Sequence, residues 1–248
     1  MKLSCFVTGT DTDVGKTLVA AALLHKCVER GWRSIGMKPV AAGGTQEAAG
    51  QWRNADADAL MAAANVTAAL EDINPYCFPE AIAPHLAAAH AGRRIEPECI
   101  LDSFRRLQAR AEAIVVEGAG GFLIPLNERN DSAALVSMLE LPVVLVVGMR
   151  LGCINHALLT QEAILARGLS LVGWVANVID PQMAELEDNL ATLRAHLSAP
   201  LLGVVPWLDH PDPLRVAACL SLPADGAVVL AKSGNVRNGR QGNGRQKQ

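Results

Sequence analysis

The stretch Gly9-Thr10-Asp11-Thr12-Asp13-Val14-Gly15-Lys16-Thr17 follows an apolar run and precedes an amphipathic stretch that begins at Lys16. A glycine-containing turn between a strand and a helix is typical of a loop that binds phosphate groups. In such a loop, backbone N–H groups would surround the phosphates, Lys16 would reach the β- and γ-oxygens, and the Thr17 hydroxyl would ligate Mg²⁺. The stretch therefore predicts a nucleotide site at the end of the first strand.

This phosphate loop departs from the usual pattern in one position. The pattern has a glycine where Thr10 stands, and Gly9 is one residue too early. Such variant loops are found in the deviant P-loop families of small synthetases and partition ATPases. A plain strand-to-helix turn with a surface lysine is the simpler alternative, and the Gly-Lys-Thr end of the loop argues against it.

Short apolar runs alternate with longer amphipathic stretches along the rest of the chain, as in βαβ units with a parallel sheet. We therefore predict an α/β fold: a single P-loop NTPase-like domain of three layers, with a mostly parallel central sheet flanked by helices. The expected strands are 3–7, 34–40, 114–117, 142–147, 171–177 and 201–205, with 142–147 central because it is the most apolar. The expected helices are 16–30, 56–65, 84–91, 97–112, 155–167 and a long one ending near 197, while 71–84 should be largely irregular because of its three prolines.

Composition narrows the class of protein further. The 248 residues are 50% hydrophobic with a formal net charge of −3, which suits one large domain and argues against a dedicated nucleic-acid binder. No apolar run is long enough for a membrane span, and six cysteines without a Cys-x-x-Cys pair predict reduced thiols and a cytosolic protein. We expect a domain over 1–222 and a low-complexity, disordered tail over 223–248.

Lysine is rare in this chain. Between Leu3 and Ala231 it occurs only as Lys16, Lys26 and Lys38. Lys16 and Lys38 fall at the carboxyl ends of the first two predicted strands, where open α/β sheets bind ligands. A lysine is a compact, mobile charge that suits a phosphoryl group in transfer. Lys26 falls in mid-helix, where we expect it to be solvated.

Two carboxylates are candidates for the metal side of a nucleotide site, because Mg²⁺ takes oxygen ligands and needs one or two acids beside the phosphates. Glu117 ends an apolar strand and is followed by glycines, so it should project at the ligand edge of the sheet. Asp56 opens a helix and could reach the same edge or could serve only as the helix N-cap. Asp58 is a competitor that the sequence does not exclude.

An ordered set of motifs resembles the dethiobiotin synthetase family from residue 6 to about 208. The matching stretches are 6–17 (FVTGTDTDVGKT), 36–40 (GMKPV), 53–56 (RNAD), 74–76 (NPY), 116–121 (VEGAGG), 151–156 (LGCINH), 173–177 (GWVAN), 200–203 (PLLG) and 206–207 (PW). The resemblance implies an ATP-dependent cyclo-ligase with Mg²⁺. Its substrates would be 7,8-diaminopelargonate, CO₂ and ATP, joined through a carbamate and a carbamic-phosphoric anhydride.

The resemblance also implies roles for particular residues. Lys38 and Lys16 would be catalytic, and Thr17, Asp56 and Glu117 would be the metal-side groups. Nucleotide contacts would come from Asp13, Val14, Gly15, Lys16, Thr17, Leu18, Asp56, Glu117, Gly118, Ala119, Gly120, Asn177, Pro206, Trp207 and Leu208. Substrate contacts would come from Thr12, Ala42, Gly118, Gly152, Cys153, Ile154 and Asn155. The segment 152–155 opens a predicted helix and would hold the substrate tail of a neighbouring subunit, which implies a homodimer.

Two departures from the family pattern bear on the substrate. Family members usually carry serine where this chain has Ala42, and glutamate where it has Asp13. Loss of one neutral hydrogen bond is worth about 0.5–1.5 kcal/mol, so Ala42 predicts weakened activity rather than none.

Three other functions remain open at this point. One is a partition-type ATPase switch, although residues 10–14 contain no second lysine. Another is a cobyrinate-type amidotransferase, for which the chain lacks a glutaminase domain. The third is a catalytically silent ATP-binding relative.

Overall fold

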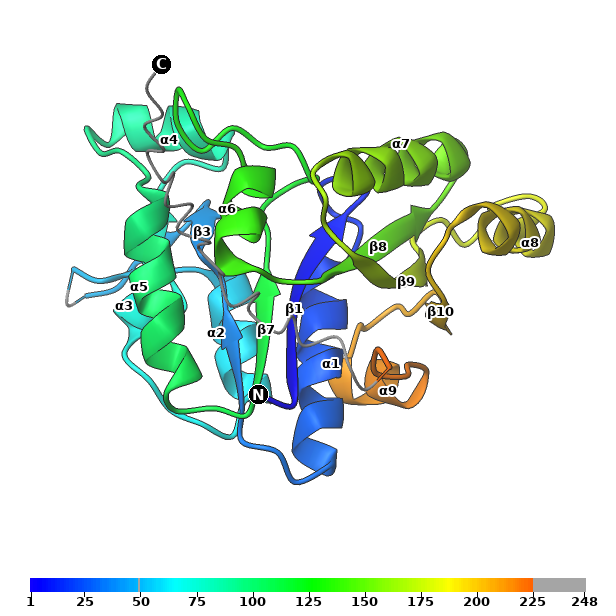
Figure 1. Ribbon diagram of the computed structural model, residues 1–248, viewed down its shortest axis with the longest axis horizontal. Coiled ribbons are helices and arrows are strands. Elements are labelled where there is room, and N and C mark those ends of the chain that lie inside the picture. The colour runs from blue at the N-terminus through cyan, green and yellow to red at the C-terminus, as the bar shows by residue number, and fades with distance from the viewer. Residues whose placement is uncertain (49, 225–248) are drawn as a thin grey trace, which may run out of the picture.

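The computed structural model describes residues 1–48 and 50–224. Within that part of the chain a parallel sheet of six strands runs in the order β10-β9-β8-β1-β7-β2 (Figure 1). Its strands are β1 (Leu3–Gly9), β2 (Ser34–Met37), β7 (Ala113–Glu117), β8 (Val143–Met149), β9 (Leu171–Val178) and β10 (Leu201–Val205). The predicted α/β class and the central place of the strand after Pro142 are both confirmed.

Helices cover both faces of this sheet and complete the three predicted layers. One face packs against α1 (Lys16–Glu29), α2 (Ala55–Ala63) and α9 (Pro213–Ala218). The other packs against α5 (Pro97–Gln108), α6 (Ser132–Leu139), α7 (Cys153–Ala166) and α8 (Leu186–His196). The short helices α3 (Leu70–Ile73) and α4 (Pro84–His90) lie beside the layer that contains α5 (Figure 1).

The core explains why the strands are apolar without alternation. In β1, Cys5 and Val7 belong to the cluster that contains α1, whereas Phe6 between them belongs to the cluster that contains α5 and α6. Strands that are covered on both faces bury every side chain, so they favour continuous runs of Val, Ile and Leu.

Several element boundaries differ from the prediction, and the largest difference follows Met37. The expected strand 34–40 is divided, because the chain leaves the main sheet at Lys38-Pro39 and proline has no N–H to donate. Two small sheets follow, β3 (Val40–Ala42) paired with β6 (Tyr76–Phe78), and β4 (Thr45–Gln46) paired with β5 (Trp52–Arg53). The expectation that 71–84 is irregular is therefore wrong in part, since α3 and β6 reach into it.

Two helices and one lysine contact also escaped prediction. Neither α6 nor α9 was expected, although each begins after an aspartate N-cap, Asp131 and Asp212 respectively. Lys26 is not simply solvated, because its Nζ donates to the carbonyl of Ala217 in α9 at 3.2 Å.

None of the described helices is long and apolar enough to cross a membrane. Residues 225–248, most of the predicted tail, lie outside the described residues, and the division at 222 stays a prediction.

Candidate active site

The ligand edge of the sheet is fixed by its topology. All six strands are parallel, so their carboxyl ends lie along one edge. Residues 10–15 follow β1, Lys38 follows β2, Glu117 ends β7, and Asn177 lies near the end of β9. Residues more than a hundred positions apart are therefore brought to one place by the strand order alone.

The phosphate loop occupies the centre of this edge. Gly15 has φ 88° and caps α1, and a Cβ at this position would lie 2.2 Å from Asn177 Nδ2. Asn177 itself donates from Nδ2 to the carbonyl of Val14 at 2.9 Å, which ties the loop to β9. Glycine is needed here both for the left-handed backbone and for the close approach of Asn177. The Lys16 side chain is buried, and its Nζ donates to the carbonyl of Asp11 at 2.9 Å.

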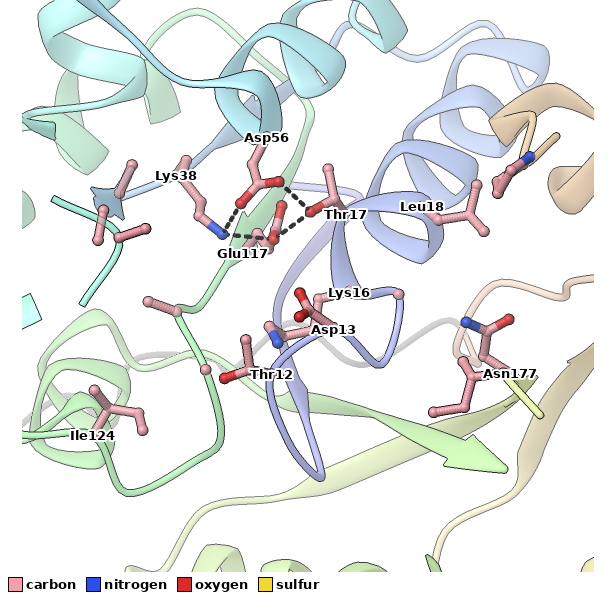
Figure 2. Close-up of a pocket in the computed structure, with 18 of the residues that line it drawn as sticks. Thr12, Asp13, Lys16, Thr17, Leu18, Lys38, Asp56, Glu117, Ile124 and Asn177 are labelled. Carbon is pink, nitrogen blue, oxygen red and sulfur yellow. Dashed lines mark hydrogen bonds and ion pairs between the residues drawn. The ribbon is translucent and has the colours of Figure 1, made fainter. Parts of the chain in front are cut away.

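Beside the loop, four polar side chains form a compact cluster that we call the lysine–acid cluster: Thr17, Lys38, Asp56 and Glu117 (Figure 2). Lys38 Nζ lies 2.6 Å from Glu117 Oε1 and 2.8 Å from Asp56 Oδ2. Thr17 Oγ1 lies 2.8 Å from Asp56 Oδ1 and 2.8 Å from Glu117 Oε1. Lys38 and Glu117 are 3% and 1% exposed, so their charges are compensated mainly by one another.

Burial and charge act in opposite directions on the pKa values of this cluster. Burial alone would lower the pKa of Lys38, but the Glu117 and Asp56 carboxylates outweigh it and raise that pKa. Burial raises the pKa of Glu117, and Lys38 offsets only part of this rise. Burial would also raise the pKa of Asp56, but the charge and hydrogen bond of Lys38 hold it below its ordinary value. Asp56 is thus the more stable anion, and Glu117 is the acid that most readily takes a proton.

The cluster has the donor set that Mg²⁺ prefers. The Thr17 hydroxyl has one proton but two carboxylate oxygens at 2.8 Å, so one of these contacts brings oxygen lone pairs together. Glu117 Oε2 is buried and has no hydrogen-bond partner among the described residues. A bound cation would relieve both features. The described residues hold no group of three or more His, Cys, Asp or Glu side chains that could bind a metal, so Mg²⁺ would also need phosphate oxygens or water.

The two alternatives for Asp56 are decided by the geometry. The N-cap of α2 is Asn54, whose side chain accepts from the backbone N–H of Asp56 at 3.0 Å, so the N-cap interpretation of Asp56 is wrong. The Asp58 carboxylate pairs with Arg53 instead of joining the lysine–acid cluster. Asp56 is therefore the acid of α2 that faces Lys38 and Thr17.

The loop and the lysine–acid cluster line a cavity of about 1110 Å³. This volume exceeds that of an ordinary small-molecule pocket and is large enough for a nucleotide together with a small acid. In Figure 2, Ile124 and Asn177 lie on opposite sides of the loop. The predicted site residues that line the cavity are Thr12, Asp13, Gly15, Lys16, Thr17, Leu18, Lys38, Ala42, Asp56, Glu117, Ala119, Gly120, Asn177, Pro206, Trp207 and Leu208.

The remaining predicted site residues lie elsewhere. Val14 belongs to the loop, but its side chain is buried in the core cluster that contains α1, and Gly118 is buried with its carbonyl accepting from Lys38 Nζ at 3.2 Å. Gly152, Cys153, Ile154 and Asn155 are not among the residues that line this cavity. Gly152 is the N-cap of α7 with φ 94°, and the Cys153 N–H already donates to the carbonyl of Arg150 at 3.0 Å.

One wall of the cavity was not predicted. It is apolar and includes Val40, Ala41, Ile124 and the segment 81–84. The sequence does contain a signal for this segment, since Pro84 starts α4 and the residues before it must form a connection. Periodicity gave no sign that this connection faces the phosphate loop.

Comparison with known proteins places the chain among close relatives. Residues 4–214 match the family model described as an AAA domain. The chain is 54% identical over 218 residues to the ATP-dependent dethiobiotin synthetase BioD of Aromatoleum aromaticum, covering 88% of this chain and 96% of that protein. It is 54% identical over 227 residues to the ATP-dependent dethiobiotin synthetase BioD of Xylella fastidiosa, covering 91% of this chain and 100% of that protein.

Solved structures with low sequence identity share the architecture. A ParA family ATPase from Chlorobium tepidum superposes with a TM-score of 0.52 at 14% identity, covering 88% of this chain and 94% of that one. The MinC:MinD cell division protein complex of Aquifex aeolicus gives a TM-score of 0.51 at 14% identity, covering 84% and 82%. At this level of identity the likeness shows the P-loop NTPase-like fold alone.

Proposed function

The chain belongs to the ATP-dependent dethiobiotin synthetase family, ligases of biotin biosynthesis, and from this premise we propose that it joins 7,8-diaminopelargonate and CO₂ at the expense of ATP. One amine of the diamine adds to CO₂ and loses a proton, which gives a carbamate. The γ-phosphoryl group of ATP moves to a carbamate oxygen and releases ADP. The second amine then attacks the carbamate carbon and expels phosphate, which closes the ureido ring.

The observation that carries this proposal is that Lys16 and the lysine–acid cluster, which contains Lys38, line one cavity. A carbamate and a phosphoryl group in transfer are both anionic, and two buried ammonium groups stabilise such charge better than water does. Lys16 would hold the β- and γ-oxygens. Lys38 would hold the carbamate and follow the phosphoryl group, because its flexible stem carries a compact charge.

Mg²⁺ belongs to the proposal as the partner of the nucleotide. Thr17, Asp56 and Glu117 would hold it, and when bound it neutralises charge on the phosphate oxygens. Asp56 and Glu117 also hold the Lys38 ammonium, through ion pairs of 2.8 and 2.6 Å. The nucleotide base would lie toward Asn177, Pro206, Trp207 and Leu208, which line the opposite part of the cavity.

We further propose that the enzyme is a homodimer. Support comes from exposed apolar side chains at and near α7, since Leu151, Leu159 and Leu165 are 94%, 57% and 48% exposed. In this arrangement residues 152–155 of one subunit would hold the carboxylate tail of substrate in the cavity of the other. Light scattering after size-exclusion chromatography would test it, and a monomer at micromolar concentration would contradict it.

A cytosolic location fits the same proposal. All six cysteines lie within the described residues and are unpaired, as expected in a reducing compartment.

The proposed reaction is tested by the dependence of ADP release on the acceptor. We expect ADP release to require both 7,8-diaminopelargonate and bicarbonate, and Lys38→Ala to abolish it while ATP binding measured by calorimetry stays close to wild type. ADP release at the same rate without the diamine would identify an ATPase switch instead. Tight ATP binding with no turnover under any condition would identify a silent relative.

A further inference from the structure

An ion pair joins the phosphate loop to the start of α7, on residues for which the proposed reaction gives no role. Arg150 directly follows β8, and its Nη2 lies 2.6 Å from Asp11 Oδ2. Both side chains are close to half exposed, at 44% and 46%. An exposed ion pair of this kind contributes little to the stability of the fold. A role for this pair therefore depends on the groups that Asp11 contacts.

Asp11 makes two further contacts inside the loop. Its Oδ1 accepts from the Thr12 N–H at 2.7 Å, and its main-chain carbonyl accepts from Lys16 Nζ at 2.9 Å. Asp11 therefore contacts both Thr12, which lines the cavity, and the buried Lys16 ammonium. Among the described residues, Arg150 is the group outside the loop whose side chain is paired with the Asp11 carboxylate.

The charge of Asp11 needs compensation for a second reason. Asp11 and Asp13 are both acidic, and Asp13 lines the cavity that would receive the phosphates of a nucleotide. The Lys16 ammonium would bind those phosphates, so it is not available to compensate the charge of Asp11. Arg150 neutralises Asp11 from the solvent side, so the loop presents less negative charge to an incoming polyanion.

Arg150 also contacts the start of α7, although it lies two residues before the N-cap Gly152. Its carbonyl accepts from the Cys153 N–H at 3.0 Å, and Gly152, two residues after Arg150, takes a left-handed conformation. One residue thus connects the end of β8, the first turn of α7 and the phosphate loop.

We propose that Arg150 is a positioning residue for the nucleotide, acting through Asp11 to hold the phosphate loop in the conformation that accepts ATP. This inference rests on the proposed function to the extent that it takes ATP as the ligand of the loop. It predicts an effect on the KM for ATP that is not explained by a loss of folding stability, because Asp11 contacts groups that face the cavity.

The variants that test this inference are Arg150→Met, Arg150→Lys, Asp11→Asn and the double variant Arg150→Met with Asp11→Asn. We expect Arg150→Met to raise the KM for ATP about three- to fivefold, as fits the loss of one exposed ion pair, with kcat within about twofold of wild type. Arg150→Lys should restore most of the loss because it keeps the charge. The double variant should be no worse than Asp11→Asn, since Arg150 has nothing to hold once the carboxylate is gone.

The matched control is Arg167→Met at the other end of α7. Arg167 is 41% exposed, close to Arg150, and forms an ion pair with the 27% exposed Asp131, Nη2 to Oδ2 at 2.7 Å; neither residue lines the cavity. The KM for ATP should not change in this variant. The melting temperatures of all the variants, measured alongside, separate positioning from damage to the fold.

Two results would overturn the inference. One is a KM for ATP in Arg150→Met equal to wild type. The other is a further rise in the double variant over Asp11→Asn, which would mean that Arg150 acts on the nucleotide directly. If the wild-type protein makes no dethiobiotin, the same variants are compared by calorimetric binding of a non-hydrolysable ATP analogue. Weaker binding of the analogue by Arg150→Met would then support the inference even if the proposed reaction fails, and unchanged binding would contradict it.

Discussion

Replacing Lys38 by methionine is the perturbation with the most specific consequences. Methionine keeps the length and the apolar stem of the side chain but removes the ammonium. The Glu117 carboxylate, 1% exposed, then loses the cation at 2.6 Å, and Asp56 loses its cation at 2.8 Å. Asp56 can recover some hydration because 39% of its side chain is exposed, but Glu117 cannot.

The expected loss of stability follows from the fate of Glu117. Removing one partner of a buried ion pair costs about 3–5 kcal/mol when the other charge stays unpaired. Glu117 can avoid part of this cost by taking a proton, because burial already raises its pKa in the presence of Lys38. In the variant this pKa rises further. The folded variant then binds one proton more than the unfolded chain, so its free energy of unfolding falls by about 1.4 kcal/mol per pH unit.

The pH window of this effect opens above the ordinary pKa of a glutamate and closes at the raised pKa of Glu117. Urea unfolding of wild type and Lys38→Met at pH 6 and pH 8, in EDTA, measures the free energy of unfolding of each protein inside this window. The loss of stability should be larger at pH 8 than at pH 6. Added Mg²⁺ should recover part of it in the variant, because a cation can replace the missing ammonium between the two acids.

Lys26→Met is the matched control for this experiment. Lys26 is also a partly buried lysine, but its Nζ donates to the neutral carbonyl of Ala217 at 3.2 Å. Its replacement should cost about 1 kcal/mol equally at both pH values. If Lys38→Met loses the same stability at pH 6 and pH 8, or none at all, Lys38 is not the compensating charge of Glu117.

The remaining predictions concern the loop, the pocket and the tail. Gly15→Ala should lower the free energy of unfolding by roughly 1–3 kcal/mol through backbone strain and weaken ATP binding through the 2.2 Å approach to Asn177 Nδ2. Gly31→Ala, with φ 73° and no atom within 4 Å, should show the strain without the loss of ATP affinity. Ala42→Ser should hold or lower the KM for 7,8-diaminopelargonate, and a clear rise would mean that the pocket is arranged differently. Deleting residues 234–248 should change neither the melting temperature nor kcat, and a loss of either would refute the expectation that this polar segment packs nowhere.

Much of the site was predictable because its residues stand at the ends of strands. Lys16, Lys38 and Glu117 each follow or end an apolar run, and parallel strands bring their carboxyl ends to one edge whatever their separation in sequence. The local pattern therefore shows at which edge of the sheet these side chains lie. It does not contain which neighbours they contact.

The unpredicted parts depend on contacts between distant segments. The pairing of β3 with β6 joins Val40–Ala42 to Tyr76–Phe78, two runs that are too short to show a period. Whether Asp56 or Asp58 faces Lys38 depends on the orientation of α2, which is set when α2 packs on α1 and β2. The Arg150–Asp11 pair is likewise absent from any local pattern. By contrast, α6 carried a readable signal in Asp131 and the apolar residues that follow it.

The most direct test of the proposed function is mass spectrometry of the products formed by purified protein with 7,8-diaminopelargonate, bicarbonate and Mg-ATP. The proposal predicts a new mass equal to that of dethiobiotin, which disappears when any one component is left out and when Lys38→Ala replaces the wild type. Absence of that mass, with ATP still bound tightly, would contradict the proposed reaction and point to another acceptor for the phosphoryl group.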